Sequence, residues 1–483
     1  RFHVILSNRN TLPDTSSRLS RRWEKDFVKF VTKGGGFVSL HSGSSAFYGW
    51  DDFHRIGIGR WGRDTRQGQI TTGRISELDQ DHPVTKGLKE FYITDEFWEK
   101  TDIFPGSIPI AKVYAESGSD GKPIFEPALL YNHFRKGRCI YIALGHDEKA
   151  IRNTGLRTLL VRSTQWAARE DINDETIPWF LRENSTLKEE DYSWCETDTS
   201  VCLKNSSNPV WQFNFNDRYG KPYFHPLTTG SSVLTCVSPV DHPWHLGLWF
   251  SWKFINGVNY WEYTDNKISG TAGYTSEGLT EITNIEIAKG SDFSCRISMD
   301  LIYHPDKGVP VLSEGRFINV SPPGKDGSYS IDFESVFTPF DDGVNLDRTP
   351  IEGEPEGKSW GGYAGLSVRF NQDFTSPFTI SEKENNDPKT SEWLYMGFLT
   401  LTGDTAGICI LKSPDFTTKN TRWYVNNDPS VPFYYFSPAV LYDGKIALER
   451  NEKLILKYRI WIMPHKTDRE ILKKKYQEYT KAS

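Results

Sequence analysis

The sequence predicts two domains of different class, an α/β domain followed by an all-β domain. In the first third of the chain, short apolar runs alternate with helical segments, which is the pattern of β-α-β units around a parallel sheet. After Trp211 the pattern changes to many closely spaced apolar runs separated by glycine, proline and asparagine, which is typical of a large antiparallel β-sandwich. The 483 residues also exceed what a single hydrophobic core usually spans.

The α/β domain is expected over residues 1–175. The segment before its central strand places Trp23, Phe27, Phe30 and Val31 on one face of a helix, and glycines 34–36 then end that helix. Further apolar runs and one amphipathic segment complete the pattern. We expect strands at 4–6, 37–40, 108–113 and 139–144, and a second helix at 156–168.

The rest of the chain is divided by composition. Residues 176–210 are rich in Ser, Asn, Thr, Asp, Glu and Lys, and are interpreted as a linker. Residues 211–465 are predicted to form the β-sandwich, and 466–483 a basic C-terminal helix.

The composition limits the classes of partner. A net charge of −6 offers no basic patch for nucleic acid, and no apolar run approaches the roughly 18 residues of a membrane helix, so we expect neither partner. We also expect no cofactor, because no Gly-x-Gly-x-x-Gly follows a strand and no phosphate loop is present; a divalent metal at a histidine site is left open. Homo-oligomer formation is left open too.

The cysteines and sequons bear weakly on location. A disulfide between Cys195 and Cys202 would indicate an oxidising compartment, and Asn-x-Ser/Thr at Asn184, Asn205 and Asn319 is compatible with secretion. We therefore favour a secreted or periplasmic location without assigning one.

Polar side chains gather at the predicted strand ends of the first domain. His41 and Ser42 end one strand, His146 and Asp147 end another, and Asp95 with Glu96 lies in a predicted loop. The carboxyl ends of parallel strands lie at one edge of a sheet, where open α/β folds bind ligands. Such a set supplies a general acid and base or holds a metal, whereas the alternative is that each histidine only caps a turn.

A second candidate is the segment 240–261 of the sandwich. His242 and His245 are separated by Pro243, so no helix presents both on one face. With Trp249 and Trp261 they suit sugar binding or acid/base chemistry, while a metal would need an added carboxylate, and a packed aromatic turn is the alternative. We place His225 and Arg369 on the same concave face, where the arginine would bind hydroxyls or a carboxylate.

Five motifs in order carry a resemblance to the ThuA-like (trehalose-utilisation) domain, which is similar to class I glutamine amidotransferases and has a flavodoxin-like sheet. They are Gly34–Ser42, Trp61–Arg63, Asp81–Leu88, Asp95–Glu96 and Lys136–Asp147. The resemblance implies that His41 stands where the amidotransferases have their nucleophilic cysteine, and His146 with Glu148 where they have histidine and glutamate. Without that thiol, amide hydrolysis through a thioester is not expected.

In this domain we expect substrate contacts from Ser42, Trp61 and Arg63. ThuA-like domains usually have a further β-α-β portion before the strand that corresponds to residues 2–6, so we expect the sheet to be truncated at its N-terminal side.

In the second domain, the segment 240–250 and four other motifs resemble the PmoA-related family, a domain of uncertain function often found near sugar-catabolic proteins. The four are Gly220–Leu227, Gly365–Arg369, Arg422–Val425 and Leu454–Ile460. The pattern of that family has a histidine at the position of Trp244 and an arginine at that of Leu246, which counts against a metal here. The size and strand number are similar to the galactose-mutarotase-like supersandwich, and Arg422 is expected to contact substrate.

Both domains thus indicate that the protein acts on or binds a carbohydrate. We predict an enzyme that hydrolyses, eliminates or isomerises a glycoside or an oxidised (keto) sugar by acid/base chemistry. The alternative is a non-catalytic glycan-binding protein with a degenerate amidotransferase-like domain.

Overall fold

The structure, a computed structural model, describes residues 2–11, 14, 16–183, 191–216, 220–262, 277–340, 343–383, 390–414, 421–431 and 433–482. The chain divides into two compact units. The first comprises Arg1–Ser185 with Thr400–Gly403, and the second Thr186–Leu399 with Asp404–Ser483.

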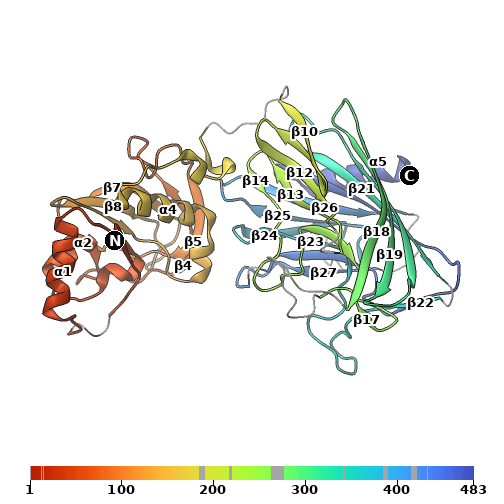
Figure 1. The fold of residues 1–483 in the computed structure, drawn as a ribbon, viewed down its shortest axis with the longest axis horizontal. Coiled ribbons are helices and arrows are strands. Elements are labelled where there is room, and N and C mark those ends of the chain that lie inside the picture. The colour runs from red at the N-terminus through yellow and green to blue at the C-terminus, as the bar shows by residue number, and fades with distance from the viewer. Residues whose placement is uncertain are drawn as a thin grey trace. The chain divides into compact units, whose positions relative to one another are not determined.

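The first unit is built on a seven-stranded sheet of order β1-β2-β9-β8-β7-β4-β5. Figure 1 labels its strands β4, β5, β7 and β8. The β1-β2 and β2-β9 pairs are parallel, whereas the β9-β8, β8-β7, β7-β4 and β4-β5 pairs are antiparallel, so the predicted parallel sheet is a mixed one. The reason is the two-residue turn between Phe134 and Gly137, which is too short for a parallel return. The strands are β1 (Val4–Ser7), β2 (Gly36–Leu40), β4 (Ile70–Ser76), β5 (Phe91–Glu96), β7 (Ile108–Ala115), β8 (Ile124–Phe134) and β9 (Gly137–Ile142), with a separate pair β3 (Gly59–Arg60) and β6 (Asp102–Ile103).

Helices cover both faces of this sheet. Phe37 packs with Phe27 on one face, whereas a Cβ on Gly36 would lie 2.3 Å from the Ala167 carbonyl oxygen on the other. The first face therefore carries α1 (Arg21–Thr32), which begins at its N-cap Ser20, and α2 (Asp51–Gly57), and the second carries α4 (Thr154–Ala168). The remaining helices of the unit are short: α3 (Glu148–Arg152) and the 3₁₀ turns η1 (His41–Ser45), η2 (Asp174–Thr176) and η3 (Trp179–Leu181).

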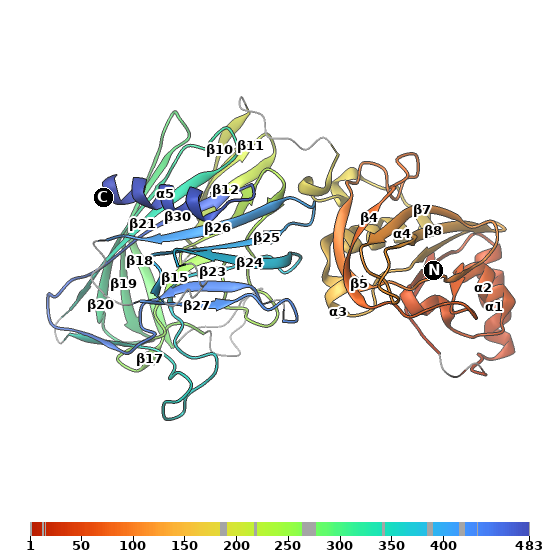
Figure 2. The ribbon, with the colours of Figure 1, turned by 180° about the vertical axis from the view of Figure 1, so that it is seen from behind.

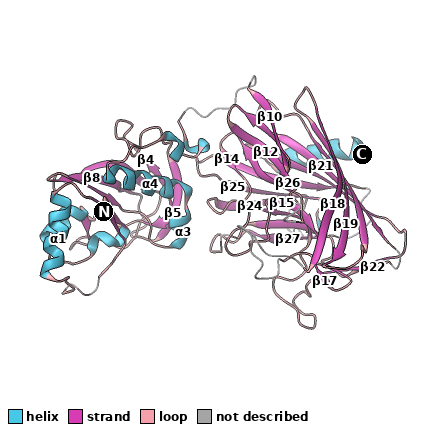
Figure 3. Cartoon of the chain, viewed as in Figure 1, coloured by secondary structure: helices cyan, strands magenta, loops and turns pink. Residues whose placement is uncertain are grey.

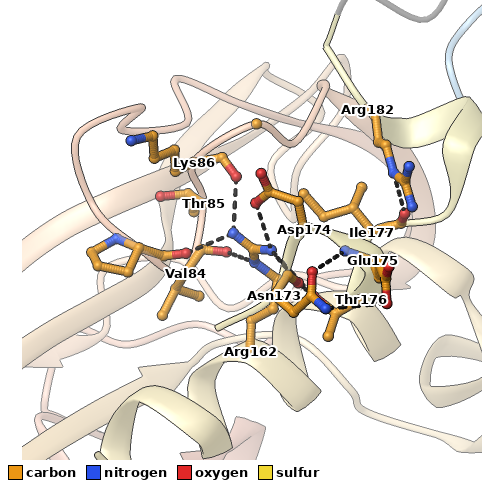
Figure 4. A network of polar contacts seen from close by, with 12 residues as sticks. Val84, Thr85, Lys86, Arg162, Asn173, Asp174, Glu175, Thr176, Ile177 and Arg182 are labelled. Carbon is orange, nitrogen blue, oxygen red and sulfur yellow. Dashed lines mark hydrogen bonds and ion pairs between the residues drawn. The ribbon is translucent and has the colours of Figure 1, made fainter. Parts of the chain in front are cut away.

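The 81–88 motif is held by one buried arginine. Arg162 of α4 donates from Nε to the Val84 carbonyl oxygen at 2.7 Å, and from Nη2 to the carbonyl oxygens of Pro83 and Lys86 at 2.6 and 2.9 Å (Figure 4). Its third nitrogen, Nη1, reaches the Thr176 hydroxyl at 3.2 Å. Arg162 thus ties both the 81–88 loop and the segment after α4 to that helix.

The second unit is an antiparallel β-sandwich, as the sequence predicts (Figures 2 and 3). Its core lies between two large sheets, across which Phe250 of one packs on Phe333 of the other, and Phe370 on Phe398. One sheet has the order β10-β11-β12-β13-β15-β23-β28-β27, with β14 paired to β13, and the other β18-β19-β20-β21-β30-β26-β25-β24. The first comprises β10 (Tyr192–Thr197), β11 (Ser200–Asn205), β12 (Asn208–Asn214), β13 (Tyr223–Thr229), β14 (Ser232–Val233), β15 (Leu248–Ser251), β23 (Gly365–Arg369), β27 (Arg422–Asn426) and β28 (Tyr435–Ala439).

The second large sheet comprises β18 (Gly278–Lys289), β19 (Cys295–Pro305), β20 (Leu312–Val320), β21 (Tyr329–Pro339), β24 (Thr375–Ser381), β25 (Trp393–Leu399), β26 (Thr405–Lys412) and β30 (Leu454–Met463). A small sheet adds β16 (Phe254–Ile255), β17 (Val258–Asn259), β22 (Val344–Asp347) and β29 (Ile446–Leu448). Helix α5 (Arg469–Ala482) follows β30, near the predicted bounds.

The stretch 176–210 is not a linker throughout. It contains η3, β10, β11 and the start of β12. The strands β10 and β11 form because the polar residues of 192–205 alternate with side chains such as Trp194 and Leu203 that join the sandwich core. Cys195 and Cys202 lie opposite each other on β10 and β11, and both are free thiols in the structure, without the disulfide that the sequence left open. Among the described residues, no helix is long and apolar enough to span a bilayer.

Candidate functional site

His41 stands at a sharp elbow where β2 ends and η1 begins. Its φ of 46° is left-handed, a conformation that costs energy in a residue with a Cβ and that is common at functional sites. Gly43 permits the elbow, because a Cβ there would lie 2.5 Å from the Ser7 carbonyl oxygen at the end of β1. The imidazole is held, buried, at the C-terminal edge of the parallel strands.

Two other strands bring Glu96 and His146 to the same edge. Glu96 is the last residue of β5, and His146 follows β9. Glu96 Oε1 lies 3.6 Å from His41 Nε2 and 3.5 Å from His146 Nδ1, and the two ring nitrogens lie 3.4 Å apart. We call these three side chains the His41–Glu96–His146 triangle. Its sides are nearly equal, and all exceed the roughly 2.7–2.9 Å of a charge-assisted N–H···O bond.

Two members of the triangle, His41 and Glu96, have further partners that fix the orientation of their side chains. His41 Nδ1 lies 3.1 Å from the Ala143 carbonyl oxygen, and Glu96 accepts hydrogen bonds from Gln67 Nε2 and Trp98 Nε1, both at 2.7 Å. Burial by itself would raise the pKa of Glu96, but the His41 imidazole and these two donors outweigh it and lower the pKa to about 2. Glu96 is therefore an anion at neutral pH.

Asp95 positions the triangle instead of joining it. Its carboxylate accepts backbone N–H bonds from Gly145 at 2.6 Å, His146 at 3.0 Å and Glu96 at 2.9 Å. Burial raises its pKa, against the opposing effect of these hydrogen bonds. Asp147, the other acidic residue expected at the site, is the N-cap of α3 and accepts from Ala150 N at 2.8 Å. The hydrogen bonds described for these two carboxylates go to backbone N–H groups and not to the imidazoles, although the charge of His41 acts on the pKa of Asp95.

Aromatic rings enclose one side of the triangle. The Trp98 ring lies 4.7 Å from His41, centroid to centroid, and Trp61 packs edge-on against Trp98 at 5.0 Å. The His146 side chain is 35% exposed and leaves the site open to solvent. Ser42 lies in η1 beside His41, and Arg63 is exposed in the following loop. Sequence reasoning missed Trp98 and Gln67. Trp98 could have been found, because it lies two residues after Glu96, and residues two apart in an extended chain point to the same side.

In the second unit, Asp241, which the sequence analysis does not single out, contacts two predicted site residues, His242 and Arg369. Asp241 Oδ2 lies 2.9 Å from His242 Nδ1 and accepts from Arg369 Nη2 at 2.7 Å. Burial would raise the pKa of Asp241, but the bonds with His242 and Arg369 hold it well below its usual range. Arg369 is fully buried and stacks over Phe433, 4.1 Å from the ring centroid.

His245 lies at the centre of an aromatic box. Its ring packs 4.7 Å from His242, 5.0 Å from Trp249 and 5.4 Å from Tyr435, with Trp261 at 6.1 Å. Among the described residues neither ring nitrogen of His245 has a hydrogen-bond partner, and the same holds for Arg369 Nε and Nη1 and for the indole nitrogens of Trp249 and Trp261. Burial holds the pKa of His245 well below its ordinary value, so the ring is neutral.

Two expected residues lie apart from this box. His225 Nδ1 contacts the Thr235 hydroxyl at 2.9 Å, and burial lowers its pKa to about 4. Arg422 forms an ion pair with Asp443 at 2.6 Å. Sequence reasoning missed Lys221, which is buried and donates to the Trp261 carbonyl oxygen; burial lowers its pKa to about 7.

Comparison with known families finds a match for each half of the chain. Residues 200–477 match a family of unknown function, DUF6807, and residues 1–167 match the ThuA family, described as trehalose utilisation. The ThuA resemblance is thereby confirmed, whereas the match to the second domain carries the DUF6807 label and not the PmoA-related one. A search of curated proteins finds no match.

Three solved structures are similar to parts of the chain. A protein described as ThuA-like from Parabacteroides merdae is 22% identical, with a TM-score of 0.31 over 36% of this chain and 72% of its own. An alpha-galactosidase from Lactobacillus brevis is 8% identical, with a TM-score of 0.29 over 58% of this chain and 40% of its own. A protein described as an aldose 1-epimerase from Klebsiella pneumoniae is 11% identical, with a TM-score of 0.27 over 60% of this chain and 88% of its own.

Proposed function

The chain belongs to the DUF6807 family of unknown function and carries a ThuA domain, and from this we propose that it is a carbohydrate-processing enzyme whose reacting centre is the His41–Glu96–His146 triangle. The substrate class is a glycoside or an oxidised (keto) sugar, and the reaction is a hydrolysis, elimination or isomerisation that depends on proton transfer.

The observation that carries the proposal is the convergence of two imidazoles and an ionised carboxylate on one point. The three come from segments separated by about fifty residues each, and no salt bridge of good geometry requires them to meet. A strained backbone at His41 and a dedicated buried aspartate beneath His146 add to the cost of the arrangement. Such costs are typical of sites retained for chemistry.

The arrangement suits proton transfer at a sugar carbon or hydroxyl. The His146 ring is the partly exposed member, open to a substrate, and Glu96 supplies a negative charge beside it. Trp61 and Trp98 offer apolar ring faces of the kind against which sugars pack.

A substrate screen tests this proposal. The full chain is incubated with disaccharides and with their 3-keto derivatives, and products are followed by mass spectrometry. We expect turnover by the wild type and a loss of about 100-fold or more in Glu96→Gln, which keeps the shape of the side chain without its charge. Equal rates in both proteins would remove the triangle from the mechanism.

A second function, glycan binding without turnover, is favoured by the aromatic box of the second unit. Its buried donors without described partners, Arg369 Nη1 and the Trp249 and Trp261 indoles, each cost stability unless a ligand or water pairs with them. Calorimetric titration with the same sugars checks this. Binding that is weakened at least tenfold in Arg369→Met, with no product formed by the wild type, would select this function.

A further inference from the structure

We propose that the His41–Glu96–His146 triangle binds one divalent d-block ion in tetrahedral geometry, Zn²⁺ in the first place, through His41 Nε2, Glu96 Oε1 and His146 Nδ1. The proposal deepens the proposed function of the same site. The role of the ion in catalysis rests on the proposed function, whereas the existence of the metal site is argued from geometry alone.

The distances between the three candidate ligand atoms are the main evidence for a metal ion. Zn²⁺ binds imidazole nitrogen and carboxylate oxygen at about 2.0–2.2 Å, so two ligands of a tetrahedral ion lie about 3.3–3.5 Å apart. The triangle has sides of 3.4, 3.5 and 3.6 Å. Adjacent ligands of an octahedral ion with 2.1 Å bonds would lie only about 3.0 Å apart. The observed spacing therefore favours the tetrahedral ion.

The orientation of His41 also calls for a cation between the groups. His41 Nδ1 lies within hydrogen-bond distance of Ala143 O, which only accepts, so in the tautomer that pairs with this oxygen Nε2 presents a lone pair. That lone pair faces the carboxylate oxygen of Glu96. In that tautomer the two electron-rich atoms repel each other, and a metal ion between them would remove the repulsion, as a proton on Nε2 does when the imidazole lowers the pKa of Glu96.

The surroundings have the other features of a metal centre. The partner atoms of His41 and Glu96, namely Ala143 O, Gln67 Nε2 and Trp98 Nε1, are the outer hydrogen bonds that orient metal ligands. Three protein ligands leave a fourth position for water or substrate, as in catalytic zinc sites, and the exposed edge of His146 gives access. When bound, the ion would supply a water acidic enough to act as the base near neutral pH.

Metal binding is measured on the full chain in the absence of sugar. The protein is stripped with a chelator, dialysed against Zn²⁺ and analysed for metal by mass spectrometry. We expect about one Zn²⁺ per chain, and with Co²⁺ the intense visible absorption of a four-coordinate site. Octahedral Co²⁺ absorption would overturn the tetrahedral assignment, and no retained Zn²⁺ would overturn the site.

Variants locate the ion. Glu96→Gln and His146→Asn are expected to lose it, whereas His242→Asn, which changes the other histidine cluster, and His304→Asn are expected to keep it. Should a ligand variant fail to fold, Gln67→Ala removes only an outer hydrogen bond from a side chain near the surface and is expected to weaken Zn²⁺ binding about 10- to 100-fold. Unchanged affinity in all triangle variants would overturn the proposal.

The outcomes separate this inference from the proposed function. One Zn²⁺ bound at the triangle without turnover of any sugar would support the metal site and contradict the enzyme. Turnover that survives chelation, with no metal bound, would contradict the metal site and leave proton transfer by the side chains themselves.

Discussion

Glu96 is the residue whose charge the site depends on most, and its titration is open to measurement. Its folded-state pKa of about 2 lies below the ordinary 4.5, so its ionised form stabilises the fold. That contribution is present above pH 4.5 and is lost as the pH falls from there through about 2.

We therefore expect the metal-free wild type to lose stability more steeply than Glu96→Gln between pH 4.5 and the lowest pH at which both remain folded. Denaturant unfolding at a series of pH values measures this. Parallel profiles for the two proteins would show that Glu96 titrates normally.

Asp95 is expected to act through the backbone. Asn retains one acceptor oxygen but places an NH₂ group against a backbone N–H of Gly145 or His146, so Asp95→Asn loses a charge-assisted bond of about 1.5–3 kcal/mol. Thermal unfolding should show the loss. The matched control, Asp147→Asn, keeps an N-cap of similar quality on α3 and should unfold near the wild-type temperature. Equal effects of the two changes would contradict the positioning role.

At the scale of elements, the elbow after β2 depends on a glycine. A Cβ at Gly43 would lie 2.5 Å from the Ser7 carbonyl oxygen, which is backbone and cannot move without displacing β1. We expect Gly43→Ala to destabilise the first unit by about 2 kcal/mol or more and to shift His41. Gly57→Ala in α2 meets nothing closer than 3.6 Å and serves as the control, with no loss expected by thermal unfolding.

The junction of α4 with the 81–88 loop depends on Arg162. Arg162→Met leaves the carbonyl oxygens of Pro83, Val84 and Lys86 without their buried donor, and we expect a loss of about 3 kcal/mol in denaturant unfolding. Arg157→Met, on the same helix but at an exposed position, is the control. A small effect of Arg162→Met would show that water replaces the guanidinium.

Local patterns predicted the elements that are formed by residues close in sequence. The glycine stop after α1, the buried strand β2 and the alternating strands of the sandwich are all visible in the residue pattern. The strand that carries Asp95 and Glu96 was expected as a loop, because β5 is defined by antiparallel pairing with β4, and such pairing depends on distant partners. The strands inside the expected linker were missed for the same reason.

At the scale of the whole molecule, the sequence likewise predicted some features of the candidate site and not others. His41 and His146 could be named from the sequence because both follow predicted strands, and strand ends of one sheet meet. Glu96 was named from a predicted loop, and it joins them because it is the last residue of β5. Their distances could not, since these follow from the Asp95 hydrogen bonds and the mixed sheet order. The aromatic box was expected to include His225, but the pleat of β13 gives that ring Thr235 as its partner.

The central claim is that the reacting centre lies in the first unit and not in the aromatic box of the second. Its most direct test is kcat/KM on whichever sugar the screen identifies, measured for His146→Asn and His242→Asn, each of which changes one partly exposed imidazole. The account predicts a fall of about 100-fold or more for His146→Asn at unchanged unfolding temperature, and a smaller effect, confined to KM, for His242→Asn. Full activity in His146→Asn together with a lost kcat in His242→Asn would contradict it.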